Sequence, residues 1–75
     1  MALEDVLFHP VESSNVAEIG YDDEEMVLYV RFNKGALYYY EEVPPDIWDE
    51  FVYTESKGRF IHTHLKGRYP YGRIE

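Results

Sequence analysis

Residues 26–43, with the sequence MVLYVRFNKGALYYYEEV, decide the fold that we predict for this chain. In their first part Leu28, Val30 and Phe32 occupy every second position, the pattern of a strand with one buried apolar face. The letters NKG follow, and Gly35 can adopt the positive φ that a short hairpin loop requires. We therefore predict an antiparallel hairpin at the centre of the domain.

The return strand of this hairpin, residues 36–43, carries three consecutive tyrosines. Because side chains alternate along a strand, Tyr38 and Tyr40 share one face and Tyr39 points to the other. Tyr38 and Tyr40 are either a platform on which bases stack or core aromatics that pair with the preceding strand. The core interpretation is favoured, because a chain of 75 residues needs its aromatic side chains for burial.

The sequence before the hairpin predicts one further strand. Residues 1–10 show little pattern, so we expect a loose lead-in followed by a single domain over residues 11–75. A first strand is expected over residues 11–21. Val16 is out of phase with the apolar residues that follow it, which predicts a bulge near Ala17-Glu18.

A helix is expected after the hairpin. The pair Pro44-Pro45 ends the return strand and is suited to a helix start. Gly58 is the residue expected to end this helix, in a left-handed conformation. Four apolar residues form the stripe that would cover the hairpin: Ile47, Trp48, Phe51 and Val52.

Residues 59–66 fit two interpretations. Their apolar spacing favours a second short helix that Gly67 ends, whereas strand alternation would bring His62 and His64 to one face. Residues 68–74 are expected to be an extended tail or edge strand. The predicted fold is therefore α+β: about three antiparallel strands packed against one or two short helices.

The charge of the chain is unevenly distributed. The formal net charge is −8, yet residues 1–54 carry −11 and residues 55–75 carry +3. An anionic ligand would be repelled by the first part and attracted by the second. The chain has no cysteine and no long apolar run, and its start lacks the basic residues of a secretory signal, so we expect a cytoplasmic protein that does not enter a membrane.

The order of several short motifs resembles the KTSC domain, a small bacterial and phage domain that also occurs at the C-terminus of some lysyl-tRNA synthetases. The resemblance runs from about residue 11 to 74, and the family's Tyr-x-Tyr corresponds to Tyr38 and Tyr40. It implies a domain of unestablished function, with RNA binding suggested by the synthetase context. The motifs are Ser13-Ser14, Ile19-Gly20-Tyr21-Asp22, Leu28-Tyr29-Val30-Arg31-Phe32, Gly35, Tyr38-Tyr39-Tyr40, Val43-Pro44, Ser56-Lys57-Gly58-Arg59-Phe60 and Tyr69-Pro70-Tyr71.

We predict a binding module rather than an enzyme. The sequence has no glycine-rich phosphate loop and no recognisable nucleophile–base spacing. The acidic run 22–25 lacks the spacing of a calcium loop, and His62 with His64 would need a distant third ligand such as His9. We therefore expect no catalytic residues, cofactor or metal.

The primary hypothesis is recognition of RNA or a small nucleotide by aromatic and basic residues. The alternative is an acidic protein-interaction module or inhibitor, a nucleic-acid mimic of the phage type, which would use residues 22–25, Glu41-Glu42 and Asp46-Asp49-Glu50 on a protein partner. The candidate ligand-binding residues are Tyr38, Tyr40, Lys57, Arg59, His62, Lys66, Arg68, Tyr69, Tyr71 and Arg73.

Overall fold

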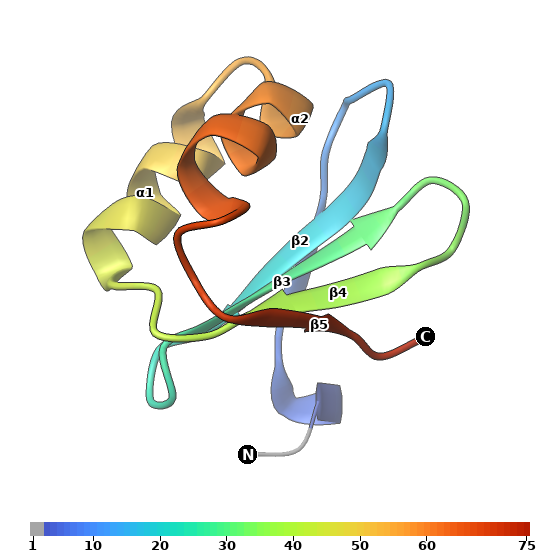
Figure 1. Ribbon diagram of the computed structural model, residues 1–75. Helices are drawn as coiled ribbons and strands as arrows, with labels where there is room; N and C mark the ends of the chain where they lie inside the picture. The colour runs from blue at the N-terminus through green and yellow to red at the C-terminus, as the bar shows by residue number, and fades with distance from the viewer. Residues whose placement is uncertain (1–2) are drawn as a thin grey trace.

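The computed structural model describes residues 3–75 as a five-stranded antiparallel sheet with helices on one face (Figure 1). The strands follow one another in the sheet in chain order, each paired with the next. This is the predicted α+β class. The strands are β1 (Phe8–Pro10), β2 (Val16–Asp22), β3 (Val27–Phe32), β4 (Leu37–Tyr40) and β5 (Tyr71–Arg73).

The expected number of about three strands was too low, because two short edge strands flank the predicted meander. β1 pairs with β2 through Phe8 and Gly20, in a region where the sequence showed little pattern. β5 pairs with β4, as the edge-strand interpretation of the tail allowed. Strands of three residues contain too few side chains to show alternation, so pairing with a longer neighbour defines them.

The central hairpin confirms the prediction made from its sequence. Leu28 and Val30 are fully buried, and Gly35 has a φ of +100° in the turn between β3 and β4. The strand before it is shorter than expected, beginning at Val16 rather than residue 11. The predicted bulge is present, because the pairing between β2 and β3 shifts between Val16 and Glu18.

Helix α1 (Pro45–Tyr53) packs its apolar stripe onto the sheet as predicted, with one exception. Phe51 is fully buried, and Trp48 stacks on Tyr21 with ring centroids 5.3 Å apart. Val52 was expected in the stripe but is exposed, since the helix turns this residue away from the sheet. The carbonyl oxygen of Val43 accepts a hydrogen bond of 2.6 Å from the Tyr21 hydroxyl, which ties the segment before α1 to β2.

Residues 57–65 are helical, which settles the ambiguity of this segment in favour of the second helix. Helix α2 (Lys57–Phe60) continues into a π-helix, η2 (Ile61–Leu65), whose wider turn is closed by a hydrogen bond of 2.8 Å from the Lys66 N–H to the Ile61 carbonyl. Gly67 ends it with a φ of +80°, as expected. Gly58 was predicted to end the preceding helix, and that prediction was wrong. It lies inside α2, which begins after its cap, Ser56.

A short 3₁₀ helix, η1 (Leu3–Asp5), precedes β1. Within residues 3–75 we find no helix that is both long and apolar enough to cross a membrane.

Candidate functional site

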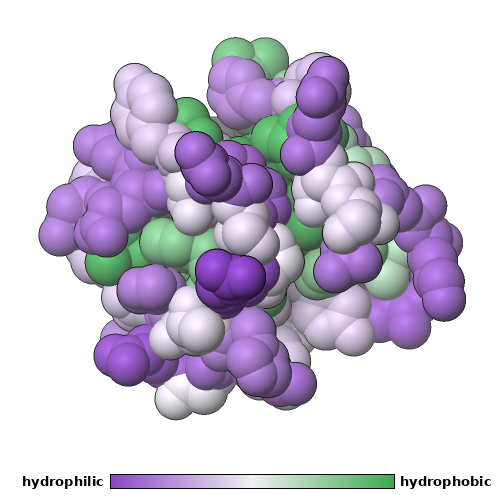
Figure 2. Space-filling model, turned by 90° about the horizontal axis from the view of Figure 1, so that it is seen from above, coloured by the Kyte–Doolittle hydropathy of each residue, from purple (hydrophilic) through white to green (hydrophobic). Residues whose placement is uncertain are grey.

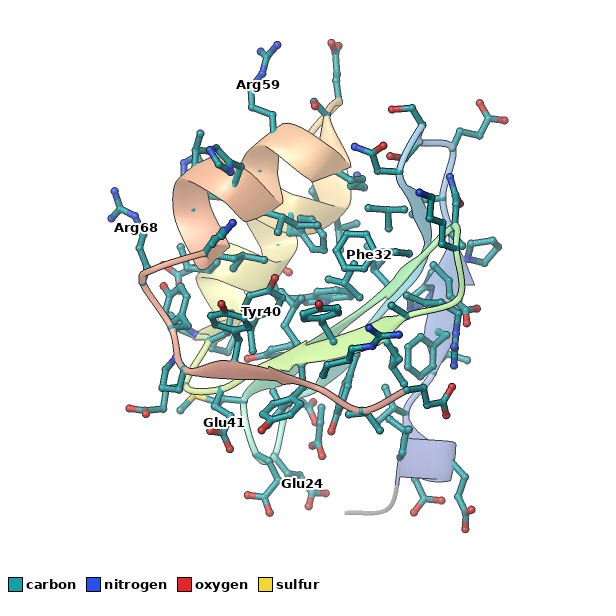
Figure 3. All side chains as sticks on the ribbon, turned by 45° about the vertical axis from the view of Figure 1, so that its right-hand side comes forward. Glu24, Phe32, Tyr40, Glu41, Arg59 and Arg68 are labelled. Atoms are coloured by element: carbon teal, nitrogen blue, oxygen red, sulfur yellow. The ribbon has the colours of Figure 1, made fainter. Side chains whose placement is uncertain are left out.

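A groove of about 590 Å³ lies between the sheet and the second helical segment. Its floor is aromatic and comes from three neighbouring strands: Phe32 on β3, Tyr38 and Tyr40 on β4, and Tyr71 on β5. Figure 3 shows Phe32 and Tyr40 in the space between the sheet and the helices. The alternation of β4 thus directs Tyr38 and Tyr40 to the same side, as predicted.

The aromatic rings of the floor contact one another. Tyr71 stacks on Tyr40 with a centroid distance of 5.7 Å and on Tyr38 with 6.4 Å, and Phe32 meets Tyr38 edge to face at 5.5 Å. Aromatic pairs of this kind favour particular ring orientations and stabilise them by more than the burial of their surface alone does. The floor is therefore a pre-arranged set of ring faces.

The two central tyrosines differ in how much surface they offer. Tyr40 is only 4% exposed, and burial, with Tyr71 and Tyr38 nearby, raises its pKa to about 12. Tyr38 is half-buried and Tyr71 is exposed. Tyr40 is therefore a core residue that only borders the groove, while Tyr38 and Tyr71 present the accessible ring surface.

The wall opposite the floor is formed by the helical segment. Gly58 and Ile61 line it, and so do His62 in the π-helix and Lys66 at its end. Single π-turns occur often at functional sites, because the wider turn changes the direction of the side chains that follow. Here the π-helix delivers two of the predicted site residues to one groove.

One end of the groove is formed by two loops that no spacing or motif along the chain connects. Asn33, in the β3–β4 turn, donates from its backbone N–H to the Asn15 carbonyl at 2.8 Å and from Nδ2 to the Ser14 carbonyl at 2.9 Å. Asn15, Asn33 and Lys34 all line the groove there. These hydrogen bonds fix the shape of this end before any ligand arrives.

Five of the ten predicted site residues come together at the groove: Tyr38, Tyr40, His62, Lys66 and Tyr71. The sequence analysis did not select Lys34, because this residue belongs to the acidic part of the chain and comes to the same groove as Lys66 only in the folded domain. It also missed the loop amides, since nothing in a single sequence joins residue 15 to residue 33.

Lys57 is a structural residue rather than a surface cation. Its ammonium group donates hydrogen bonds to the carbonyl oxygens of Val52 at 2.9 Å and Thr54 at 2.7 Å, at the end of α1. The residue is 8% exposed, and burial lowers its pKa. The sequence could not distinguish this helix-ending lysine from a phosphate-binding one.

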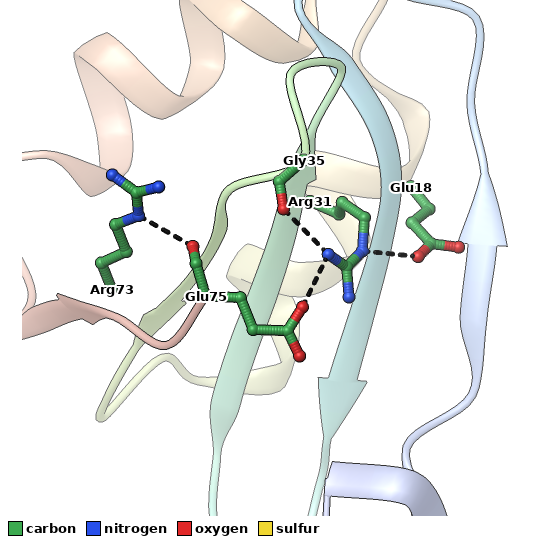
Figure 4. Close-up of polar contacts among 5 residues, drawn as sticks. All are labelled: Glu18, Arg31, Gly35, Arg73 and Glu75. Carbon is green, nitrogen blue, oxygen red and sulfur yellow. Dashed lines mark hydrogen bonds and ion pairs between the residues drawn. The ribbon is translucent and has the colours of Figure 1, made fainter.

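The other predicted residues do not line the groove. Arg59 and Arg68 point outward from the helical side (Figure 3), and Tyr69 packs against the core. Arg73 is paired with Tyr38 across the strands, but its Nε donates to the Glu75 carbonyl at 2.8 Å (Figure 4).

The surface carries no single dominant apolar area on the face drawn in Figure 2, where hydrophobic residues appear in small areas among hydrophilic ones. Within residues 3–75 there is also no group of three or more His, Cys, Asp or Glu side chains placed to hold a metal ion. The groove combines an aromatic floor, polar side chains at one end and two lysines. Such a site can hold a flat ring against the floor and an attached anion against the lysines.

Comparison with known proteins identifies relatives over nearly the whole chain. A protein of Tsukamurella paurometabola is 47% identical over 60 residues, which is 80% of this chain and 90% of that protein. An uncharacterised protein of Stutzerimonas stutzeri is 39% identical over 87% of this chain and 93% of its own length. A lysine–tRNA ligase of Trichormus variabilis is 29% identical over 97% of this chain, but the match covers only 14% of the ligase.

A solved structure shows the same architecture. The crystal structure of a KTSC domain protein from Yersinia pestis superimposes with a TM-score of 0.86 and 34% sequence identity, covering 93% of this chain and 99% of that protein. The model of the KTSC domain matches residues 12–69. This agrees with the resemblance seen in the order of the sequence motifs. The chain therefore belongs to the KTSC domain family.

Proposed function

We propose that this domain is a non-enzymatic binding module that takes a nucleotide, free or as part of RNA, into the groove between β4 and the π-helix. The observation that carries the proposal is the combination of accessible tyrosine faces with lysines in one groove. Stacking on aromatic side chains is the common way in which proteins hold unpaired bases, and it tolerates any base. Lysine and arginine supply the contacts to phosphate.

The charge of the rest of the chain supports a small ligand over a long polyanion. The protein has a net charge of −8, and Arg31 is already bonded to Glu18 and Glu75. Extended contact with nucleic acid outside the groove would meet repulsion. The synthetase relative adds only a context in which a homologous segment occurs beside a tRNA-charging enzyme.

The test is a titration of the protein with uridine and adenosine monophosphates and with single-stranded RNA, followed by amide chemical shifts. Shifts confined to Tyr38, His62, Lys66 and the two loops at the groove's end are expected. Tyr38→Leu should weaken binding about tenfold, within the 1–3 kcal/mol that one stacked base contributes. Tyr53→Leu is the matched control, because Tyr53 is 83% exposed and lies outside the groove.

A second candidate, the acidic protein-interaction module, is favoured by a different cavity of about 510 Å³. Asp5, Asp22 and Asp23 line it together with Tyr21 and Trp48. A basic side chain would meet the negative charge of these aspartates there. Burial, followed by the charges of nearby aspartates, raises the pKa of Tyr21.

A pull-down with a basic protein partner tests the second candidate. Under the second, Asp23→Asn would abolish capture and Lys66→Ala would leave it unchanged. If neither substitution changes capture, the acidic cavity is not the contact.

A further inference from the structure

The two lysines of the groove lie at its opposite ends. Lys34 is in the turn that joins β3 to β4, at the start of the β4 floor. Lys66 comes immediately before the segment that returns to the sheet beside Tyr40, where the Glu41 N–H donates to the Pro70 carbonyl at 2.7 Å. The four residue steps from Ala36 to Tyr40 correspond to about 13 Å of extended strand.

The accessible ring faces lie between these two cations. Tyr38 is in the middle of β4, and the Tyr71 ring stacks against both Tyr38 and Tyr40. A base on these rings would have a lysine on each side of it. A free mononucleotide carries phosphate on one side of its sugar only, whereas a nucleotide within a strand is flanked by phosphate on both sides.

The groove is also unsuited to a duplex. Its opposite wall is the helical segment with Ile61 and His62, so an incoming base must enter between two protein layers. A paired and stacked base cannot reach the tyrosine faces without being extruded, which costs a few kcal/mol.

We propose that the groove binds a short unpaired segment of a single nucleic-acid strand, with one base on Tyr38 and Tyr71 and the flanking phosphates on Lys34 and Lys66. This inference rests on the proposed function and narrows it. It distinguishes a strand segment from a free nucleotide, and unpaired from duplex nucleic acid.

The experiment measures the affinity of the protein for uridine monophosphate, the trinucleotide UpUpU and a 12-base-pair RNA duplex between 20 and 200 mM salt. For single strands each phosphate contact adds a slope of about −0.7 to log K against log salt. The trinucleotide is expected to show a slope of about −1.4 and to bind about tenfold tighter than the mononucleotide at low salt, where screening is weakest. The duplex is expected to bind more weakly than the trinucleotide.

Single substitutions identify the two phosphate contacts. Lys34→Ala and Lys66→Ala should each reduce the trinucleotide slope by about 0.7 and each weaken its binding several-fold at low salt. Arg59→Ala is the matched control, because this cation lines a different hollow, beside Thr63. It should leave the slope unchanged.

The outcomes separate the two proposals. Equal affinities and slopes for mononucleotide and trinucleotide, or no effect of Lys34→Ala, would overturn the strand-segment inference and leave nucleotide binding in place. Duplex binding equal to that of the trinucleotide would overturn it as well. Absence of binding by any of the three probes at 20 mM salt would contradict the proposed function itself.

Discussion

The ring of Tyr39 lies on Gly72, the residue opposite it in the neighbouring strand: a β-carbon at Gly72 would come within 2.7 Å of two carbons of the ring. This contact is on the face of the sheet away from the groove, because Tyr39 alternates with Tyr38 and Tyr40. It is one of the contacts that attach β5, a strand of three residues, to the sheet. Since β5 carries Tyr71, the far face of the sheet helps to hold the floor of the groove.

Gly72→Ala should destabilise the domain by about 1–2 kcal/mol, because the new methyl group must displace either the ring or the strand. Urea unfolding measures the loss. In a Tyr39→Ala background the same substitution should cost little. An equal cost in both backgrounds would place the conflict in the backbone instead of the ring.

Lys57→Met should lower the free energy of unfolding by about 1–3 kcal/mol, because the carbonyl groups of Val52 and Thr54 lose their donor. Methionine keeps most of the apolar stem, so the change tests the ammonium group. Lys66→Met is the control at an exposed position and should change stability by less than about 0.5 kcal/mol. Urea unfolding of both variants is the measurement, and similar losses in the two would contradict the structural role of Lys57.

The raised pKa of Tyr40 predicts that the domain loses stability at alkaline pH. Its pKa is raised from 10.0 to about 12, chiefly by burial, so the folded chain keeps the phenol proton to a higher pH than the unfolded chain does. The contribution of the Tyr40 phenol to the free energy of unfolding is fully present below pH 10. It falls by up to about 3 kcal/mol as the pH rises from 10 to 12.

Tyr40→Phe should make the stability profile flatter in this range. It should not become flat, because burial also raises the pKa values of Tyr21 and Tyr29. Chemical denaturation between pH 8 and 12 tests this. Parallel profiles for the variant and the parent would show that Tyr40 titrates alike in the folded and unfolded chains.

Arg31 joins three parts of the sheet (Figure 4). It contacts the carboxylates of Glu18 at 3.1 Å and Glu75 at 3.0 Å, and donates to the Gly35 carbonyl at 2.9 Å. Since all three contacts are partly exposed to solvent, Arg31→Met should cost only about 1 kcal/mol at low salt. The cost should shrink in 1 M NaCl, and a cost independent of salt would assign the effect to packing of the arginine stem.

The central elements of the fold were predictable because each contains enough residues to display its own period. β3 shows apolar residues at every second position, and α1 shows a stripe that places Phe51 in the core. The bulge near Ala17 followed from a single residue out of phase. β1 and β5 offered no such signal, since three residues are too few for one.

The candidate site was predictable only in part. Tyr38 and Tyr40 share a face because of strand geometry, which is a local property. Lys57 and Lys66 look alike in the sequence, yet the ammonium group of Lys57 is bound by carbonyl oxygens at the end of α1, whereas Lys66, after the π-helix, lines the groove. Only the packing of the helical segment on the sheet could separate them.

The sequence by itself determined the α+β class, the hairpin and its turn, the helical stripe and the family, because these depend on local periodicity, turn residues and motif order. The tertiary structure alone decided that Lys34, Asn15 and Asn33 line the same groove as Lys66, with the aromatic floor between them. Such a meeting depends on how separate elements pack together in three dimensions, and no spacing along the chain records it.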